Sequence, residues 1–236
     1  MTTFAEDVAA HCMTMSLKDG KPVYAFTPQR AMLKRASGGT LDEARNVGWL
    51  FYLLTKHRQG GDADEYLLFL IATLIAFDTR FIEQCVEHQR LPTTLRNFGG
   101  TLDQIEGATF PSARQARLAP KFDPKRSVSP IERRLRLLLD THMEADGRGD
   151  LPFRLRQVVK LVLDKGKGLS AGTGDSLINW DALLWDLRDW DDPDKNKSSQ
   201  KNWAKAFYAY RPPEEAGVPD AAGEADAEDL IDLDEE

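Results

Sequence analysis

The sequence predicts an all-α fold: two small helical bundles joined by an irregular basic linker and followed by a disordered acidic C-terminal tail. Apolar side chains recur three and four residues apart along most of the chain, which is the spacing of an amphipathic helix. Helix-start signatures precede several of these segments, and strand-like alternation is nearly absent. With 236 residues, 42% of them apolar, the chain is long enough for one or two domains with a real core.

The strongest helical pattern lies in residues 179–210, which hold four of the five tryptophans. Its inward positions are Trp180, Leu183, Leu184, Leu187 and Trp190, followed by Trp203, Phe207 and Tyr210. Between them, residues 191–196 combine a proline with aspartate and asparagine side chains, which favours a turn. We therefore expect an αα-hairpin with an aromatic inner face, in which only Trp185 is free to contact a partner.

Residues 1–92 are predicted to form the N-terminal bundle. One helix is expected over Phe4–Leu17. A second starts at Thr27-Pro28, a cap followed by proline at the first helical position. Its inward side chains are Met32 and Leu33, and its outward ones are Arg30, Lys34 and Arg35. A capping box at Thr40–Glu43 starts a third, and the nearly unbroken apolar run Tyr66–Phe77 marks the central helix.

Glycines and prolines interrupt this pattern at residues 93–128, which are expected to form the linker. Its basic side chains repel one another unless an anion binds; they are Arg114, Arg117, Lys121, Lys125 and Arg126. Ser129-Pro130-Ile131-Glu132 then combines a cap, a first-turn proline and a capping box, and starts the C-terminal bundle, residues 129–211. Residues 212–236 carry 11 acidic and no basic side chains and form the tail.

The net charge of -7 hides a basic middle. Residues 111–168 carry 14 basic and 7 acidic side chains, and nine of the basic ones are arginines, whose planar guanidinium suits phosphate oxygens. Basic residues lie opposite or beside the apolar stripe of two successive helices: Arg133, Arg134, Arg154, Arg156 and Lys160. Such faces can follow a sugar-phosphate backbone without reading bases, although a charged outer face is also what any soluble helix presents.

No catalytic constellation is recognisable, and no cofactor or metal is expected. The loop 166–174 is rich in glycine but lacks the spacing of a phosphate-binding loop. Aspartates could gather magnesium for phosphodiester cleavage, but a solvated helix face and a turn explain them: Asp186, Asp189, Asp191, Asp192 and Asp194. The presence of only two cysteines, with no apolar run of membrane-spanning length and no signal peptide, favours a reducing cytoplasm.

Several motifs occur in an order that resembles one known family. They are Ala31-Met-Leu-Lys-Arg-Ala, the apolar segments 49–54 and 67–77, Ile131-Glu-Arg-Arg-Leu-Arg, Pro152-Phe-Arg-Leu-Arg-Gln-Val-Val-Lys-Leu, Asn179-Trp-Asp-Ala-Leu-Leu-Trp-Asp-Leu-Arg-Asp-Trp and Asn202-Trp-Ala-Lys-Ala-Phe-Tyr. Their order and spacing over residues 28–210 resemble the CasB family, the small subunit of the type I-E CRISPR Cascade complex.

The resemblance implies an all-helical, non-enzymatic, cytoplasmic subunit of an antiviral, crRNA-guided complex, present as two head-to-tail copies beside other Cascade subunits. In that family the subunit helps to hold the crRNA–target duplex and the displaced DNA strand of the R-loop through basic helix residues. By position these are Lys34, Arg35, Arg133, Arg134, Arg154, Arg156, Lys160 and Lys201. Two other hypotheses stay open: a helical DNA-binding regulator and a metal-dependent nuclease. The acidic tail either solubilises the chain or covers the basic face as a mimic of nucleic acid.

Overall fold

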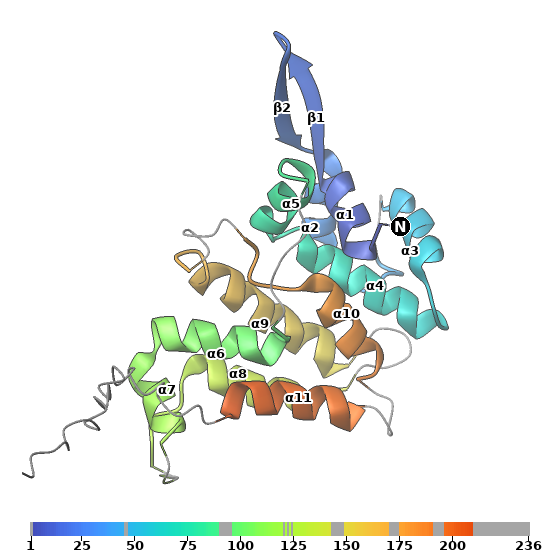
Figure 1. Cartoon of the computed structure of the whole chain (residues 1–236). Helices are drawn as coiled ribbons and strands as arrows, with labels where there is room; N and C mark the ends of the chain where they lie inside the picture. Colours follow the sequence, from blue (N-terminus) through green and yellow to red (C-terminus); the bar gives the residue numbers. More distant parts are fainter. Residues whose placement is uncertain are drawn as a thin grey trace, which may run out of the picture.

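The computed structural model describes residues 2–44, 47–89, 96–119, 121, 123, 125–142, 149–169, 175–190 and 196–209. Within these ranges it consists of helices and one two-stranded hairpin (Figure 1), so the predicted all-α class is confirmed. The helices are α1 (Phe4–Cys12), α2 (Pro28–Ala36), α3 (Gly48–His57), α4 (Asp62–Ile75), α5 (Thr79–Val86), α6 (Phe98–Thr109), α7 (Pro111–Arg117), α8 (Pro130–Leu139), α9 (Asp150–Lys165), α10 (Trp180–Arg188) and α11 (Asn196–Tyr208). No helix in the described part of the chain is long and apolar enough to cross a membrane.

The centre of the N-terminal half is α4, as its long apolar run predicts. Every residue from Leu67 to Ile75 is buried, and α1, α2, α3, α9 and α10 pack against the helix. The predicted start of α2 forms as well: the Thr27 side chain accepts a hydrogen bond from the Arg30 main-chain nitrogen. The capping box predicted at Thr40–Glu43 does not start a helix, because this segment forms a turn and α3 begins only at Gly48.

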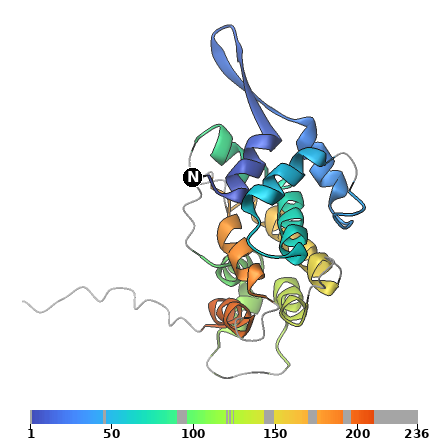
Figure 2. The same cartoon turned by 90° about the vertical axis from the view of Figure 1, so that its right-hand side faces the viewer.

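The helix predicted over Phe4–Leu17 is wrong in its second half. α1 ends at Cys12, and strand β1 (Met13–Lys18) pairs antiparallel with β2 (Lys21–Phe26). Apolar and polar residues alternate along β1, which is the period of a strand and not of a helix. The turn at Asp19-Gly20 has φ angles of 54° and 73°, the left-handed backbone that short hairpin turns require. The hairpin projects from the helical body in both views (Figure 1, Figure 2).

The stretch predicted to be an irregular linker, residues 93–128, contains the helices α6 and α7. Asn97 caps α6 by accepting a hydrogen bond from the Gly100 main-chain nitrogen, and α6 packs against α11. The two helices come close because Gly99 has no side chain: a Cβ there would lie 2.7 Å from the Cα of Trp203. The glycine pair, which lowers helix propensity, therefore marks a helix–helix contact and not a break.

Three arginines of this stretch are not left to repel one another, because carboxylates of the protein pair with Arg114, Arg117 and Arg126. Asp103 accepts hydrogen bonds from Arg114 at 2.9 Å and from Arg117 at 2.6 Å. The Arg117 side chain is 1% exposed and also pairs with the fully buried Glu106 at 2.7 Å. These ion pairs join α6 to α7. The prediction that the arginines of α7 repel one another is therefore wrong, because carboxylates of α6 neutralise them.

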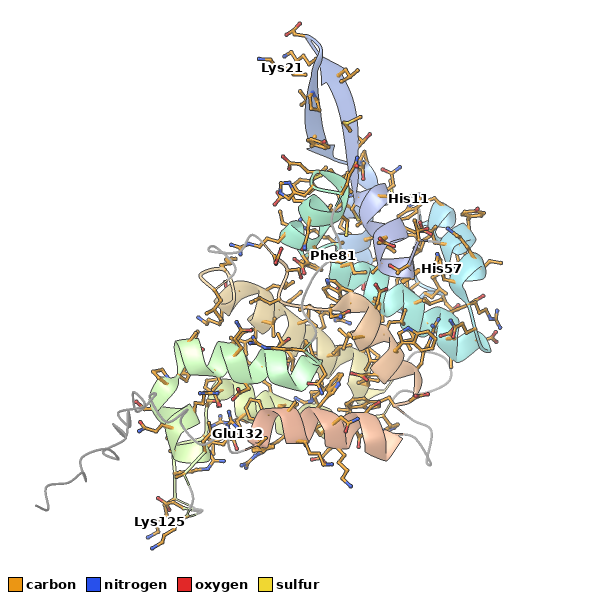
Figure 3. The ribbon with its side chains drawn as sticks, viewed as in Figure 1. His11, Lys21, His57, Phe81, Lys125 and Glu132 are labelled. Carbon is orange, nitrogen blue, oxygen red and sulfur yellow. The ribbon has the colours of Figure 1, made fainter. Side chains whose placement is uncertain are left out.

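A third buried carboxylate, Glu132 near the start of α8, also pairs with arginines (Figure 3). It accepts hydrogen bonds from Arg126 and Arg136. Ser129 caps the helix as predicted, at 3.0 Å from the Glu132 main-chain nitrogen. Only the serine half of the predicted capping box forms, because the Glu132 carboxylate is held by the two arginines.

The inward aromatic residues of α10 and α11 are buried as predicted, but the two helices do not pack along each other as a hairpin: α10 packs mainly against α4, and α11 packs against α6. The four inward aromatic side chains are at most 1% exposed: Trp180, Trp190, Trp203 and Phe207. Trp185 is 55% exposed, as its position off the stripe predicts. The predicted turn after Trp190, Tyr210 and the acidic tail lie outside the described residues.

Polar contacts tie the two halves of the chain together. Trp180 of α10 donates its indole N–H to the buried carboxylate of Asp78 at 3.0 Å, and Arg188 pairs with Asp64 of α4 at 2.8 Å. One cluster of buried apolar side chains also includes residues of both halves. The division into bundles at 1–92 and 129–211 stays a prediction.

Replacing Gly99 by alanine is expected to destabilise the protein by about 2 kcal/mol, because the added methyl group forces α6 away from the main chain of Trp203. Gly100→Ala is the matched control: a Cβ there meets its nearest neighbour at 3.5 Å, an ordinary contact, and alanine favours a helix over glycine by up to about 1 kcal/mol. Urea unfolding of both variants measures the difference, and equal stability of the two would contradict the close contact.

Asp103→Asn is expected to lower the free energy of unfolding at neutral pH by about 3 kcal/mol, because it removes the carboxylate charge that pairs with Arg114 and with the buried Arg117. Burial alone would raise the pKa of Asp103, but hydrogen bonds from Arg114 and Arg117 outweigh it, so the pKa is lowered. The folded state thus binds fewer protons, and this contribution is complete above about pH 5 and disappears as the pH falls through the folded-state pKa. Denaturant unfolding at several pH values should show the gap between wild type and variant closing in acid; a constant gap would contradict the assignment.

Candidate nucleic-acid interface

Two helices that are far apart in the sequence place lysines over the same aromatic ring. Lys34 of α2 and Lys160 of α9 lie 5.5 Å and 4.7 Å from the centroid of the Phe77 ring, which follows α4. The face of an aromatic ring attracts cations, so it holds both ammonium groups near one another. Burial, followed by the charge of Arg30, lowers the pKa of Lys34. An anion bound here would offset both effects.

Arg156 lies one turn before Lys160 on the same side of α9 and contacts the turn that follows α2. A Cβ on Gly38 would lie 3.1 Å from Nη1 of Arg156, so the guanidinium packs against the main chain of this turn. Its Nε atom is buried and has no hydrogen-bond partner among the described residues, and burial lowers the pKa of the group. A buried donor without an acceptor costs about 1–3 kcal/mol, which a phosphate oxygen reaching it would recover.

Arg35, in the last turn of α2, lies at the other side of the same turn. It is exposed and lines a hollow of about 360 Å³ together with Gly39 and Glu43. Three of the predicted site residues, Lys34, Arg156 and Lys160, thus lie where the end of α2 meets α9, and Arg35 lines the adjoining hollow. We call these four residues the α2–α9 basic cluster: Lys34, Arg35, Arg156 and Lys160.

The predicted site residues differ from other basic residues nearby in whether a carboxylate pairs with them. Four arginines between the end of α6 and the end of α8 pair with carboxylates: Arg114, Arg117, Arg126 and Arg136. Within the described ranges, no carboxylate pairs with any of the predicted site residues: Lys34, Arg35, Arg133, Arg134, Arg154, Arg156, Lys160 and Lys201. Among the described residues, none of these eight charges is neutralised by a carboxylate.

The other four predicted site residues lie outside the α2–α9 basic cluster. Arg133 is exposed and Arg134 is half-buried on α8, and Lys201 is exposed on α11. Arg154 lies over the ring of its neighbour Phe153, at 5.6 Å. Because Arg154 and Arg156 are two residues apart on one helix, they project to different sides. A nucleic-acid role for these four residues stays a prediction.

Arg30 corrects the sequence prediction, which placed it on the outer face of α2. The residue is buried, and its guanidinium donates to the Ala76 carbonyl oxygen at 2.8 Å and to the Thr79 hydroxyl at 2.6 Å. It precedes Leu33 by three residues and therefore shares the inner face of the helix. The sequence does not reveal Phe77 as a platform for two lysines, because its apolar run predicts only a core position.

The aspartates considered for a metal site do not form one in the described part of the chain, where no group of three or more potential metal-ligating side chains is found. Asp186 accepts a hydrogen bond from the indole N–H of Trp203 at 2.6 Å, which is a structural role. Asp191, Asp192 and Asp194 lie outside the described residues.

Comparisons with known proteins bear on the family to which this chain belongs. No curated protein matches the chain. A crystal structure of M. ruber CasB is similar with a TM-score of 0.51 and 24% identity, over 78% of this chain and 86% of that chain, which supports the fold. The family model of the CRISPR-associated protein Cse2 matches residues 29–208, so the projecting hairpin lies before the matched region. Because this match covers well over half of its length, the chain belongs to the Cse2 (CasB) family of CRISPR-associated proteins.

Proposed function

We propose that this chain is a non-catalytic small subunit of a type I-E, crRNA-guided Cascade complex in antiviral defence, and that it holds nucleic acid through the α2–α9 basic cluster. Membership of the Cse2 family supports a place as the Cascade small subunit. The proposal includes a second copy of the chain and other Cascade subunits as protein partners, crRNA and target DNA as nucleic-acid partners, and a cytoplasmic location.

The observation that carries the binding proposal is the convergence, from two helices, of cations that no described carboxylate pairs with. Lys34 and Lys160 share the Phe77 ring, and Arg156 lies one turn from Lys160 with a buried donor that lacks an acceptor among the described residues. Surface cations without carboxylate partners gain most from phosphate oxygens, which accept several hydrogen bonds at once. The nearby arginines that are already paired gain nothing comparable.

The chemistry of the cluster favours phosphates over base edges. Lysine ammonium groups are compact point charges on flexible stems, and contacts of this kind position a strand without reading its sequence. On this proposal the cluster binds the displaced strand or the guide–target duplex independently of sequence. Holding either of them slows the return of the displaced strand to its complement and stabilises the R-loop.

Replacing Lys34, Arg156 and Lys160 together by alanine is expected to weaken binding of single-stranded DNA and to shorten the lifetime of the R-loop in a reconstituted complex. The plot of log K against log salt should become shallower by roughly 0.7 for each phosphate that the variant no longer neutralises. Fluorescence anisotropy over a salt series measures both the affinity and the slope.

The matched control for this variant is a triple alanine substitution at Lys18, Lys21 and Lys205, which removes the same charge from exposed positions outside the cluster. It should leave affinity and salt slope close to wild type. Equal weakening by the two triple variants would contradict a localised site. A strong sequence preference of the isolated protein would instead favour a DNA-binding regulator, and magnesium-dependent cleavage would favour a nuclease.

A further inference from the structure

A cavity of about 380 Å³ opens beside the α2–α9 basic cluster, and Lys160 belongs to both. The start of α5, the C-terminal part of α9 and the segment before α10 form its walls. Its volume lies in the range of small-molecule sites, about 300–1,000 Å³. Both polar and apolar groups line it; those that matter for its chemistry are Phe77, Arg80, Glu83, Leu163, Lys167 and Leu177.

Arg80 is held in place by one end of its guanidinium and lacks a described partner at the other. Nη2 donates to the Lys167 main-chain oxygen at 2.7 Å, which fixes the plane of the group. Nη1 is buried and has no hydrogen-bond partner within the part of the chain that the structure describes. Leaving a buried charged donor unsatisfied is costly, so the site is suited to a ligand that brings an acceptor oxygen. A phosphate is the acceptor that best matches a fixed guanidinium.

Two of the acidic side chains that line the cavity have hydrogen-bond or ion-pair partners among the described residues, and a third has none there. Asp78 is buried and accepts hydrogen bonds from Ser176 and Trp180, and Asp164 lies 3.3 Å from Lys167. The Glu83 carboxylate has no hydrogen-bond or ion-pair partner in the described part of the chain. A free carboxylate accepts hydrogen bonds from the amino groups of nucleobases.

We propose that this cavity takes one unstacked nucleotide of the bound strand, with its phosphate at Arg80 and Lys160 and its base between the apolar wall and Glu83. The inference rests on the proposed function, because the nucleotide belongs to the strand that the α2–α9 basic cluster binds. It adds a base-sized subsite to a surface that otherwise contacts only the backbone. An unstacked base fits such a site because its flat apolar faces and polar edge are both exposed.

The test titrates deoxyadenosine monophosphate, inorganic phosphate and deoxyadenosine separately into the isotope-labelled full chain, followed by NMR. We expect the nucleotide to bind about tenfold or more tightly than either fragment, because base and phosphate are both held. Arg80→Gln should weaken nucleotide binding by about tenfold. Leu163→Trp, which fills the cavity and keeps every charge, should abolish it. Lys165→Ala is the control, since Lys165 carries the same charge but does not line the cavity.

Phosphate binding as tightly as the nucleotide, or nucleotide binding unaffected by Leu163→Trp, would overturn the proposal. Oligodeoxyadenylate and an abasic oligomer of equal length test whether the base comes from a bound strand: Leu163→Trp should weaken only the first, and any other pattern counts against a strand-derived base. Lys34 and Arg156 are intact in these variants, so a negative result here leaves the cluster untouched. Conversely, if the cluster variant bound single-stranded DNA as tightly as wild type, the mononucleotide titration of the wild-type chain would still test the cavity, because that titration does not use the cluster variant.

Discussion

The buried carboxylate of Asp78 is the contact on which the rest of the arrangement depends. It caps α5 by accepting a hydrogen bond from the Phe81 main-chain nitrogen at 3.1 Å, and it receives Ser176 at 2.7 Å and the Trp180 indole at 3.0 Å from the C-terminal half. Burial raises its pKa despite these three donors. A buried carboxyl group whose oxygens accept hydrogen bonds from three donors fixes geometry, and here it fixes how α5 and α10 meet.

The neighbours of Asp78 in the sequence build the candidate interface. Arg30 reaches the Ala76 carbonyl and the Thr79 hydroxyl, and the Phe77 ring holds the two lysines. Arg80 lines the neighbouring cavity with one donor that no described residue satisfies. The short connection between α4 and α5 therefore connects the core to the charged surface. Its position is set by the apolar α4 on one side and by the buried Asp78 on the other.

Most of the fold follows from apolar spacing, which predicts the central α4 and the buried tryptophans of α10 and α11. Two predictions are wrong for physical reasons. Residues Met13–Lys18 are predicted to be helical because they follow a helical pattern that hides their strand-like alternation. The segment around Gly99 is predicted to be irregular because glycine has a low helix propensity, but here the glycine permits a close contact between two helices. Spacing on α2 and α9 identifies the charges but not their pairing. The arginines that are neutralised pair with carboxylates 4 to 14 residues away, and apolar spacing does not indicate which of these side chains meet.

A nucleic acid that lies across the junction of α2 and α9 is the centre of the proposed function. Ultraviolet cross-linking of the assembled complex to target DNA and crRNA, with the linked peptides mapped by mass spectrometry, tests this placement most directly. We expect cross-links in the peptides that contain Lys34, Phe77 and Lys160. Cross-links confined to other surfaces, such as the projecting hairpin of β1 and β2 or the exposed face of α11, would contradict it.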